Sequence, residues 1–96
     1  MAKFDVGKFY MTDCVSQKAA NNWEFLKFIS DCLERHMNGD WGDMDAEDKT
    51  ANDRTLIRGN DQLFSVYKPA NHPNWRIWIV TEADRSSTTI LFPGEY

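Results

Sequence analysis

Three side chains in this sequence have the chemistry for acid–base catalysis on a phosphate ester: His36, Arg85 and Thr88. A histidine can act as a general base near neutral pH, and an arginine stabilises negative charge that develops in a transition state. The hydroxyl group of Thr88 or of Tyr67 can then position the substrate. Such a site requires a fold that brings the three side chains together.

The segment around Arg85, "TEADRSSTT" (81–89), is equally typical of a β-hairpin turn. The connection needs only residues 83–87, in which Asp84 and Ser86 can bond to the turn backbone, and a neighbouring acid can pair with the arginine. The chain also carries a net charge of −4 without a basic stripe, which would repel RNA. We therefore favour the hairpin over an active site, and we expect no direct binding of nucleic acid.

A zinc site is the first metal hypothesis, because Cys32 and His36 have the i, i+4 spacing that places two ligands on one helix face. Cys14 and His72 would complete a set of four ligands, but nothing in their spacing demands it. The favoured interpretation is a core histidine that is hydrogen-bonded within the protein.

A calcium loop beginning at Asp43 is the second metal hypothesis, and it fails. Such a loop needs glycine at its sixth position and glutamate at its twelfth, and these positions hold Asp48 and Arg54. Carboxylates at this place instead stabilise the start of a helix. We expect neither a metal nor a cofactor.

Trp41 lies between two acids and two glycines, outside any periodic element. It is expected either to cap the core at the end of a long helix or to serve as an exposed anchor for a partner protein, since tryptophan is enriched in interface hot spots. The candidate partner-binding residues are Trp41, Asp40, Asp43, Asp84 and Arg85.

The elements that must position these residues indicate an α+β fold in one domain, residues 1–96. Hydrophobic residues make up 42% of the chain, which is enough for one core. The helical stripe of 23–37 is the strongest pattern, and it ends before Gly39. A brief helix is expected over 12–20, and a polar helix, with few residues to bury, up to Gly59.

Strands are expected at the two ends of the sequence. A short first strand is expected within 3–11, and the runs 62–68, 75–82 and 88–92 predict a three-stranded antiparallel meander. In the middle run both alternating faces are apolar, which predicts a central strand that is covered on part of both faces. The helices should pack on this small antiparallel sheet.

The segments "RHMNGDWGD", "AEDKTAND", "FSVY" and "WIVTEADRSSTTILFPGEY" together resemble a family of short uncharacterised proteins carried by bacterial plasmids and other mobile elements. Such proteins show Arg-His before Gly-Asp-Trp-Gly, an acidic helix with an Asn, then Trp-Ile-x-Thr-Glu-Ala-Asp-Arg-Ser-x-Thr-Thr and a closing Tyr. The match spans residues 35–96. Residues 1–34, the loop 69–74 and the ending "PGEY" differ from this pattern. The resemblance implies a setting in which small proteins inhibit host defence or act as toxins.

These observations favour a small acidic, non-enzymatic binding protein of a plasmid or phage. It would inhibit or modulate a host nucleic-acid-handling or defence protein, such as a CRISPR or restriction effector. The alternative is a ribonuclease toxin of the RelE or barnase-like kind, which also places a helix before an antiparallel sheet and would use His36, Arg85 and Thr88.

The cysteines and the apolar runs indicate the compartment. Cys14 and Cys32 form no C-x-x-C pair, which fits reduced thiols. No run reaches the length of a membrane span, and the first residues lack a signal-peptide core. A cytoplasmic protein is expected, in which His36, Trp41 and the turn 83–87 lie together at one end of the long helix.

Overall fold

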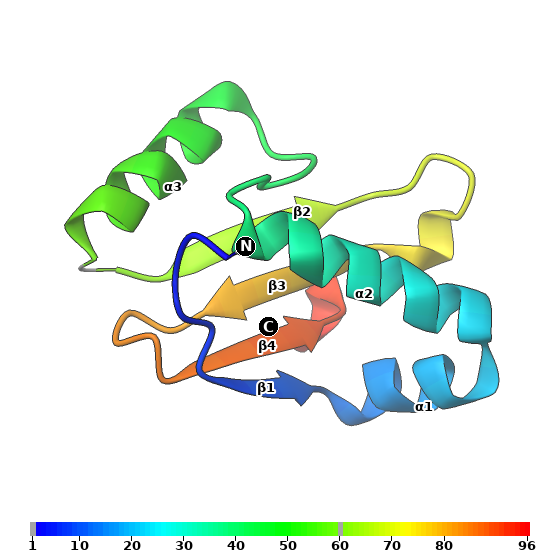
Figure 1. Ribbon diagram of the computed structural model, residues 1–96. Coiled ribbons are helices and arrows are strands. Elements are labelled where there is room, and N and C mark those ends of the chain that lie inside the picture. The colour runs from blue at the N-terminus through cyan, green and yellow to red at the C-terminus, as the bar shows by residue number, and fades with distance from the viewer. Residues whose placement is uncertain (1, 60) are drawn as a thin grey trace.

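The computed structural model describes residues 2–59 and 61–96, which form one four-stranded sheet with helices on both sides (Figure 1). The predicted α+β class is confirmed. In chain order the elements are β1 (Lys8–Met11), α1 (Asp13–Asn21), α2 (Trp23–Met37), α3 (Ala46–Arg58), β2 (Leu63–Tyr67), the 3-10 helix η1 (Pro73–Trp75), β3 (Ile77–Thr81), β4 (Ser87–Leu91) and the 3-10 helix η2 (Pro93–Glu95).

The helices begin and end close to where the capping residues predict. The side-chain oxygen of Asn22 accepts hydrogen bonds from the N–H groups of Glu24 and Phe25 and thereby starts α2. Gly59 ends α3 in the left-handed conformation, and its N–H donates to the carbonyl of Thr55. The predicted helices are therefore confirmed, because local capping chemistry determines their ends.

The sheet has the strand order β1-β4-β3-β2. Strands β2, β3 and β4 form the predicted antiparallel meander, whereas β1 pairs with β4 in parallel. Gly7, with φ +63°, brings the N-terminal segment against the backbone of Ser86, where an added Cβ would lie 2.3 Å from the carbonyl group. This close approach sets β1 beside β4.

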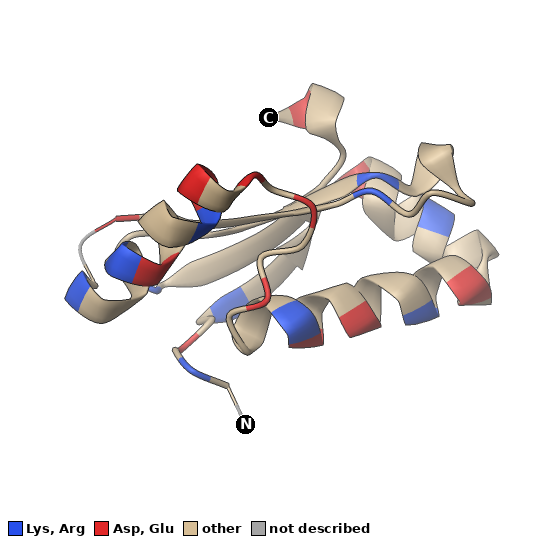
Figure 2. Cartoon of the chain, turned by 90° about the horizontal axis from the view of Figure 1, so that it is seen from above, with Lys and Arg blue, Asp and Glu red and all other residues tan. Residues whose placement is uncertain are grey.

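The sheet has two unlike faces. The helix face, on which α1 and α2 lie, consists of buried side chains: Leu63, Ser65, Tyr67, Ile77, Ile79, Thr81, Thr88 and Ile90. The opposite face carries α3 and the C-terminal segment (Figure 2). Its side chains are Phe64, Val66, Trp78, Val80, Thr89 and Leu91.

The helix α3 packs loosely on this second face. Asn52 is the one residue of α3 that is buried, whereas Ile57 is 86% exposed. The helix is attached through polar contacts on one side and not through an apolar stripe, as its polar sequence predicts. The cover that α3 gives to the sheet is incomplete.

Replacement of Gly42 by alanine is expected to lower the free energy of unfolding by at least about 3 kcal/mol. A Cβ at Gly42 would lie 2.1 Å from the carbonyl oxygen of Val66 and 2.7 Å from the Tyr67 ring. The matched control is Gly59→Ala, which has a similar φ of +68° but open space around it, and it should cost about 1 kcal/mol. Urea unfolding followed by tryptophan fluorescence measures both, and equal losses would contradict the steric argument.

Candidate functional site

A chain of buried hydrogen bonds runs through His36, which α2 holds against the sheet with no exposed surface. Its Nδ1 lies 2.5 Å from the hydroxyl of Ser65 on β2, and its Nε2 lies 2.9 Å from the hydroxyl of Thr81 on β3. Thr81 is bonded in turn to Thr88 on β4 at 2.7 Å. We call this set, with the carbonyl of Val6, the His36 chain.

The direction of every hydrogen bond in the His36 chain follows from its last member. The Val6 carbonyl can only accept, so the Thr88 hydroxyl donates to it, at 2.7 Å. Thr81 must then donate to Thr88, and it accepts from the Nε2–H of His36. The remaining nitrogen, Nδ1, accepts from the Ser65 hydroxyl. The neutral Nε2–H tautomer therefore satisfies every donor in the chain.

The surroundings of His36 keep its imidazole neutral and shielded from solvent. Burial lowers the pKa of its imidazole to about 4. The rings of Phe4 and Trp41 pack against it edge to face, with centroids 5.3 and 5.6 Å away. A general base must reach the proton that it abstracts, and here both ring nitrogens already have protein partners. His36 and Thr88 are thus structural in this conformation, contrary to the catalytic hypothesis.

Arg85 closes the hairpin, and its guanidinium contacts backbone carbonyl groups. Its Nη1 donates to the carbonyl oxygens of Asp61, Glu82 and Ala83, at 2.7, 3.0 and 3.1 Å. The predicted bond from Asp84 to the turn is present, as its carboxylate accepts from the Ser86 N–H at 2.9 Å. The connection between β3 and β4 is therefore a turn, as predicted. The Arg85 guanidinium bonds to backbone carbonyl groups in place of the expected ion pair with a neighbouring acid.

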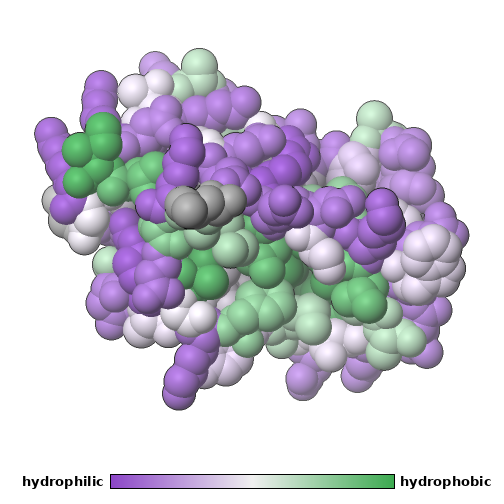
Figure 3. Space-filling view, viewed as in Figure 1, coloured by the Kyte–Doolittle hydropathy of each residue, from purple (hydrophilic) through white to green (hydrophobic). Residues whose placement is uncertain are grey.

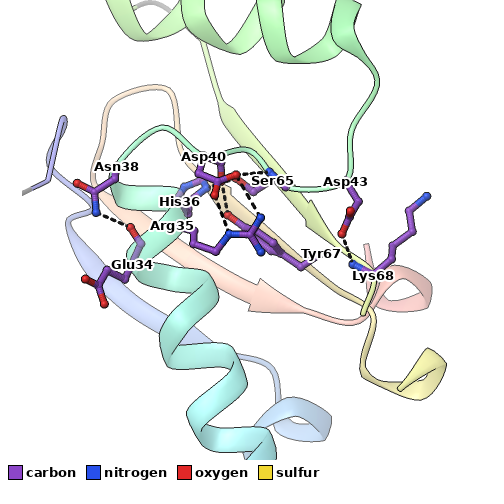
Figure 4. Close-up of polar contacts among 10 residues, drawn as sticks. Glu34, Arg35, His36, Asn38, Asp40, Asp43, Ser65, Tyr67 and Lys68 are labelled. Atoms are coloured by element: carbon purple, nitrogen blue, oxygen red, sulfur yellow. Dashed lines mark hydrogen bonds and ion pairs between the residues drawn. The ribbon is translucent and has the colours of Figure 1, made fainter. Parts of the chain in front are cut away.

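The turn after α2 is held by Asp40 (Figure 4). Its carboxylate accepts two hydrogen bonds from Arg35, at 2.7 and 3.2 Å, and a third from the Gly42 N–H. The hydrogen bond from the Arg35 guanidinium lowers the pKa of Asp40. Tyr67 lies under this guanidinium and donates to the Asp40 carbonyl at 2.7 Å.

The same turn pairs with the outer edge of β2. The Trp41 carbonyl accepts from the Val66 N–H at 3.2 Å, and the Asp43 N–H donates to the Val66 carbonyl at 2.6 Å. The Asp43 carboxylate accepts from the Lys68 N–H at 2.7 Å (Figure 4). Asp43 therefore occupies part of the place that a neighbouring strand would take.

Asn52 of α3 completes this edge. Its side-chain amide donates to the Phe64 carbonyl at 2.6 Å and accepts from the Phe64 N–H at 3.2 Å, as a peptide group would. The outward backbone groups of Phe64 and Val66 consequently all have partners, which protects β2 from pairing with another chain.

Trp41 lies in the core with 2% of its surface exposed. Its indole N–H donates to the carboxylate of Asp53 at 2.9 Å, and its ring stacks on Phe4. The expectation of Trp41 as an exposed anchor is therefore wrong for this conformation, because the indole caps the end of α2. Trp41 and His36 lie close together as predicted, with ring centroids 5.6 Å apart, and of the hairpin the β3 residue Thr81 contacts His36.

A groove lies on the second face of the sheet, where no site was predicted from the sequence. This groove, about 960 Å³ in volume, is lined by Asp43, Met44, Asp45, Asp48, Ala51, Asn52, Phe64, Val66, Lys68, Arg76, Trp78 and Pro93. Phe64 and Trp78 form a half-buried aromatic floor, and the mostly exposed Tyr96 ring meets both edge to face, at 5.7 and 5.6 Å.

Charged side chains flank this floor. Asp45 and Asp48 lie on the α3 side, and Lys68 and Arg76 are neighbours across β2 and β3, because Tyr67 pairs with Ile77. The signal for the groove was present in the sequence. The run 75–82 is apolar on both faces, while the only helix left to cover the second face is polar.

Fold and site together define a small α+β protein with a buried, hydrogen-bonded histidine and an open groove beside α3. No protein-family model matches this chain, and comparison with curated proteins and with solved structures likewise finds no match. Within residues 2–59 and 61–96, no three His, Cys, Asp or Glu side chains are grouped to hold a metal ion. No helix in the same residues is long and apolar enough to cross a membrane.

The free energy of unfolding should fall by on the order of 3 kcal/mol as the pH is lowered from about 6.5 to 4. In this window the unfolded chain protonates His36, whereas the folded state, with its lowered pKa, does not. Stability is therefore lost as the pH falls. The carboxyl groups whose pKa is lowered, such as Asp40, add their loss only below about pH 4.5.

Urea unfolding at several pH values between 7 and 4 measures this loss. A His36→Gln variant should show a much flatter dependence, while the exposed His72→Gln serves as the matched control and should keep the wild-type slope. An unchanged slope in His36→Gln would show that another group titrates.

Replacing Asn52 by aspartate should lower the free energy of unfolding by at least about 2 kcal/mol, because a carboxylate oxygen would then face the Phe64 carbonyl without a proton between them. The matched control is Asn21→Asp, whose amide donates to a backbone carbonyl in an exposed position and should cost less than about 1 kcal/mol. Thermal unfolding compares the two variants. Equal losses would mean that Asn52 does not act as an edge partner of β2.

Proposed function

We propose that this protein is a non-enzymatic binding protein whose groove between α3 and the sheet receives a segment of a partner protein. The observation that carries the proposal is the half-buried aromatic floor of Phe64 and Trp78 inside a hollow with a charged rim. Aromatic side chains in concave sites, surrounded by polar groups, are the usual anchors of protein interfaces.

The closed edge of β2 supports one mode of binding over another. Since Asn52 and the turn at Asp43 already satisfy the outward backbone groups of β2, a strand cannot be added there. A segment in the groove would instead be held through its side chains. Its apolar groups would lie on Trp78, and its charged groups would face Lys68, Arg76 and the acids of α3.

The resemblance to mobile-element proteins extends the proposal to the identity of the partner. We place the partner among host nucleic-acid-handling or defence proteins, such as CRISPR or restriction effectors, which the protein would inhibit or modulate. The net charge of −4 suits a partner with a basic surface. The ribonuclease alternative has less support, because His36 and Thr88 are buried and Arg85 is bonded to backbone carbonyls.

The test begins with capture of partners from a bacterial extract and their identification by mass spectrometry, followed by calorimetry with the purified partner. We expect Arg76→Glu, a change on the exposed rim of the groove, to weaken binding at least about tenfold. The matched control is Lys27→Glu, which makes the same change of charge on α2, on the other side of the sheet, and should bind within about twofold of the wild type.

Two results would overturn the proposal. One is a partner that binds the Arg76→Glu and Lys27→Glu variants equally well, with both variants folded. The other is RNA cleavage by the wild-type protein that is lost in folded His36→Gln and Arg85→Ala variants, since this would establish the ribonuclease.

A further inference from the structure

The two edges of the sheet differ in whether their outward backbone groups are bonded. On β2, the outward groups of Phe64 and Val66 are bonded to α3 and to the turn after α2. The other edge is β1, which is paired only with β4 among the strands of residues 2–59 and 61–96 (Figure 1). An open edge is a template for pairing with another strand.

The outward groups of β1 follow from its register with β4. Lys8 donates its N–H to the Ser86 carbonyl, and Thr12 donates to the Ile90 carbonyl. In a parallel pair alternate residues bond to the neighbouring strand, so Tyr10 also faces β4. The N–H and C=O groups of Phe9 and Met11 point away from the sheet, and in residues 2–59 and 61–96 they have no hydrogen-bond partner.

Aromatic side chains flank these free groups on both faces of the sheet. Phe9 is 43% exposed and Tyr10 is 50% exposed. Phe9 shares the helix face with Thr88, and Tyr10 shares the opposite face with Thr89. Figure 3 shows hydrophobic side chains at the surface in the lower half of the view, where Figure 1 places β1 together with β4 and α2. In a single copy, this edge therefore has both free backbone hydrogen-bonding groups and exposed aromatic side chains.

We propose that β1 pairs antiparallel with β1 of a second copy of this chain, on a two-fold axis through Tyr10. This register sets Phe9 opposite Met11 of the second copy, and Met11 opposite its Phe9. Each of these pairs exchanges two backbone hydrogen bonds, so that four bonds join the copies, and the two four-stranded sheets become one continuous sheet. The two Tyr10 side chains meet at the axis on the groove-bearing face.

The second copy is the occupant that this edge fits by its own symmetry. Phe9 and Met11 are spaced equally about Tyr10, so a two-fold rotation brings every free donor onto a free acceptor. The only charged residue of the strand, Lys8, comes opposite Thr12, and like charges do not meet. Both ends of the strand are already fixed, one by Gly7 against Ser86 and the other by the start of α1. Pairing therefore costs little conformational entropy.

Analytical ultracentrifugation of the wild-type protein, from low micromolar to about millimolar concentration, should show a monomer–dimer equilibrium, because a strand of this length forms a small interface. Tyr10→Lys and Tyr10→Glu should each weaken the dimer at least about tenfold, since the axis places like charges opposite each other. An equimolar mixture of the two variants should restore the dimer. Ile57→Lys is the control, because Ile57 is exposed on α3, away from β1, and it should leave dimerisation unchanged.

Amide hydrogen exchange locates the interface independently of these variants. The N–H groups of Phe9 and Met11 should exchange more slowly as the concentration rises, while those of Lys8 and Tyr10, already bonded to β4, should change little. The proposal is overturned by a wild-type protein that stays monomeric throughout, by a mixture of the Tyr10 variants that stays monomeric, or by a dimer in which the Phe9 and Met11 amides are not protected. None of these results bears on binding in the groove.

Discussion

The structure depends on the His36 chain of hydrogen bonds. A buried polar group is costly unless it is paired, and His36, Ser65, Thr81 and Thr88 are all buried on the helix face. Because the chain ends at the Val6 carbonyl, each hydroxyl has one possible direction, and the loss of any member leaves the next without a partner. The His36 chain joins α2, three strands and the N-terminal segment, so it fixes how α2 lies on the sheet. Both nitrogens of the imidazole are bonded within the protein and are not accessible to a substrate.

The turn after α2 transmits this constraint to the rest of the fold. With α2 fixed, Arg35 and Asp40 direct the chain along the outer edge of β2, and Asn52 then attaches α3 to that edge. The helix is held by amide and carboxylate contacts, which need little apolar burial. For this reason α3 can stand partly off the sheet, and the aromatic floor around Trp78 remains open to a ligand.

The side chains with catalytic chemistry and the exposed aromatic side chains occupy different parts of the fold. The side chains with catalytic chemistry are engaged inside the fold, as Arg85 is at the hairpin. Within the described residues, exposed aromatic side chains lie at several places, and two of these are the groove beside α3, with Tyr96, and the edge strand β1, with Phe9 and Tyr10. A protein with these two surfaces could join copies of itself through β1 and still present each groove to a partner, because Tyr10 and Trp78 lie on strands at different parts of the sheet.

The sequence by itself determined the helices, the C-terminal meander and the core position of His36, because caps, glycines and the periodicity of apolar residues act over a few neighbours. It did not determine the parallel pairing of β1, the burial of Trp41 or the partners of Arg85, since these depend on segments brought together from distant parts of the chain. The groove, too, depends on segments that are distant in the sequence. Alternation shows that Trp78 and Val80 share one face of their strand, but only the tertiary structure sets Phe64 on the same face and decides that α3, attached by Asn52, leaves it open.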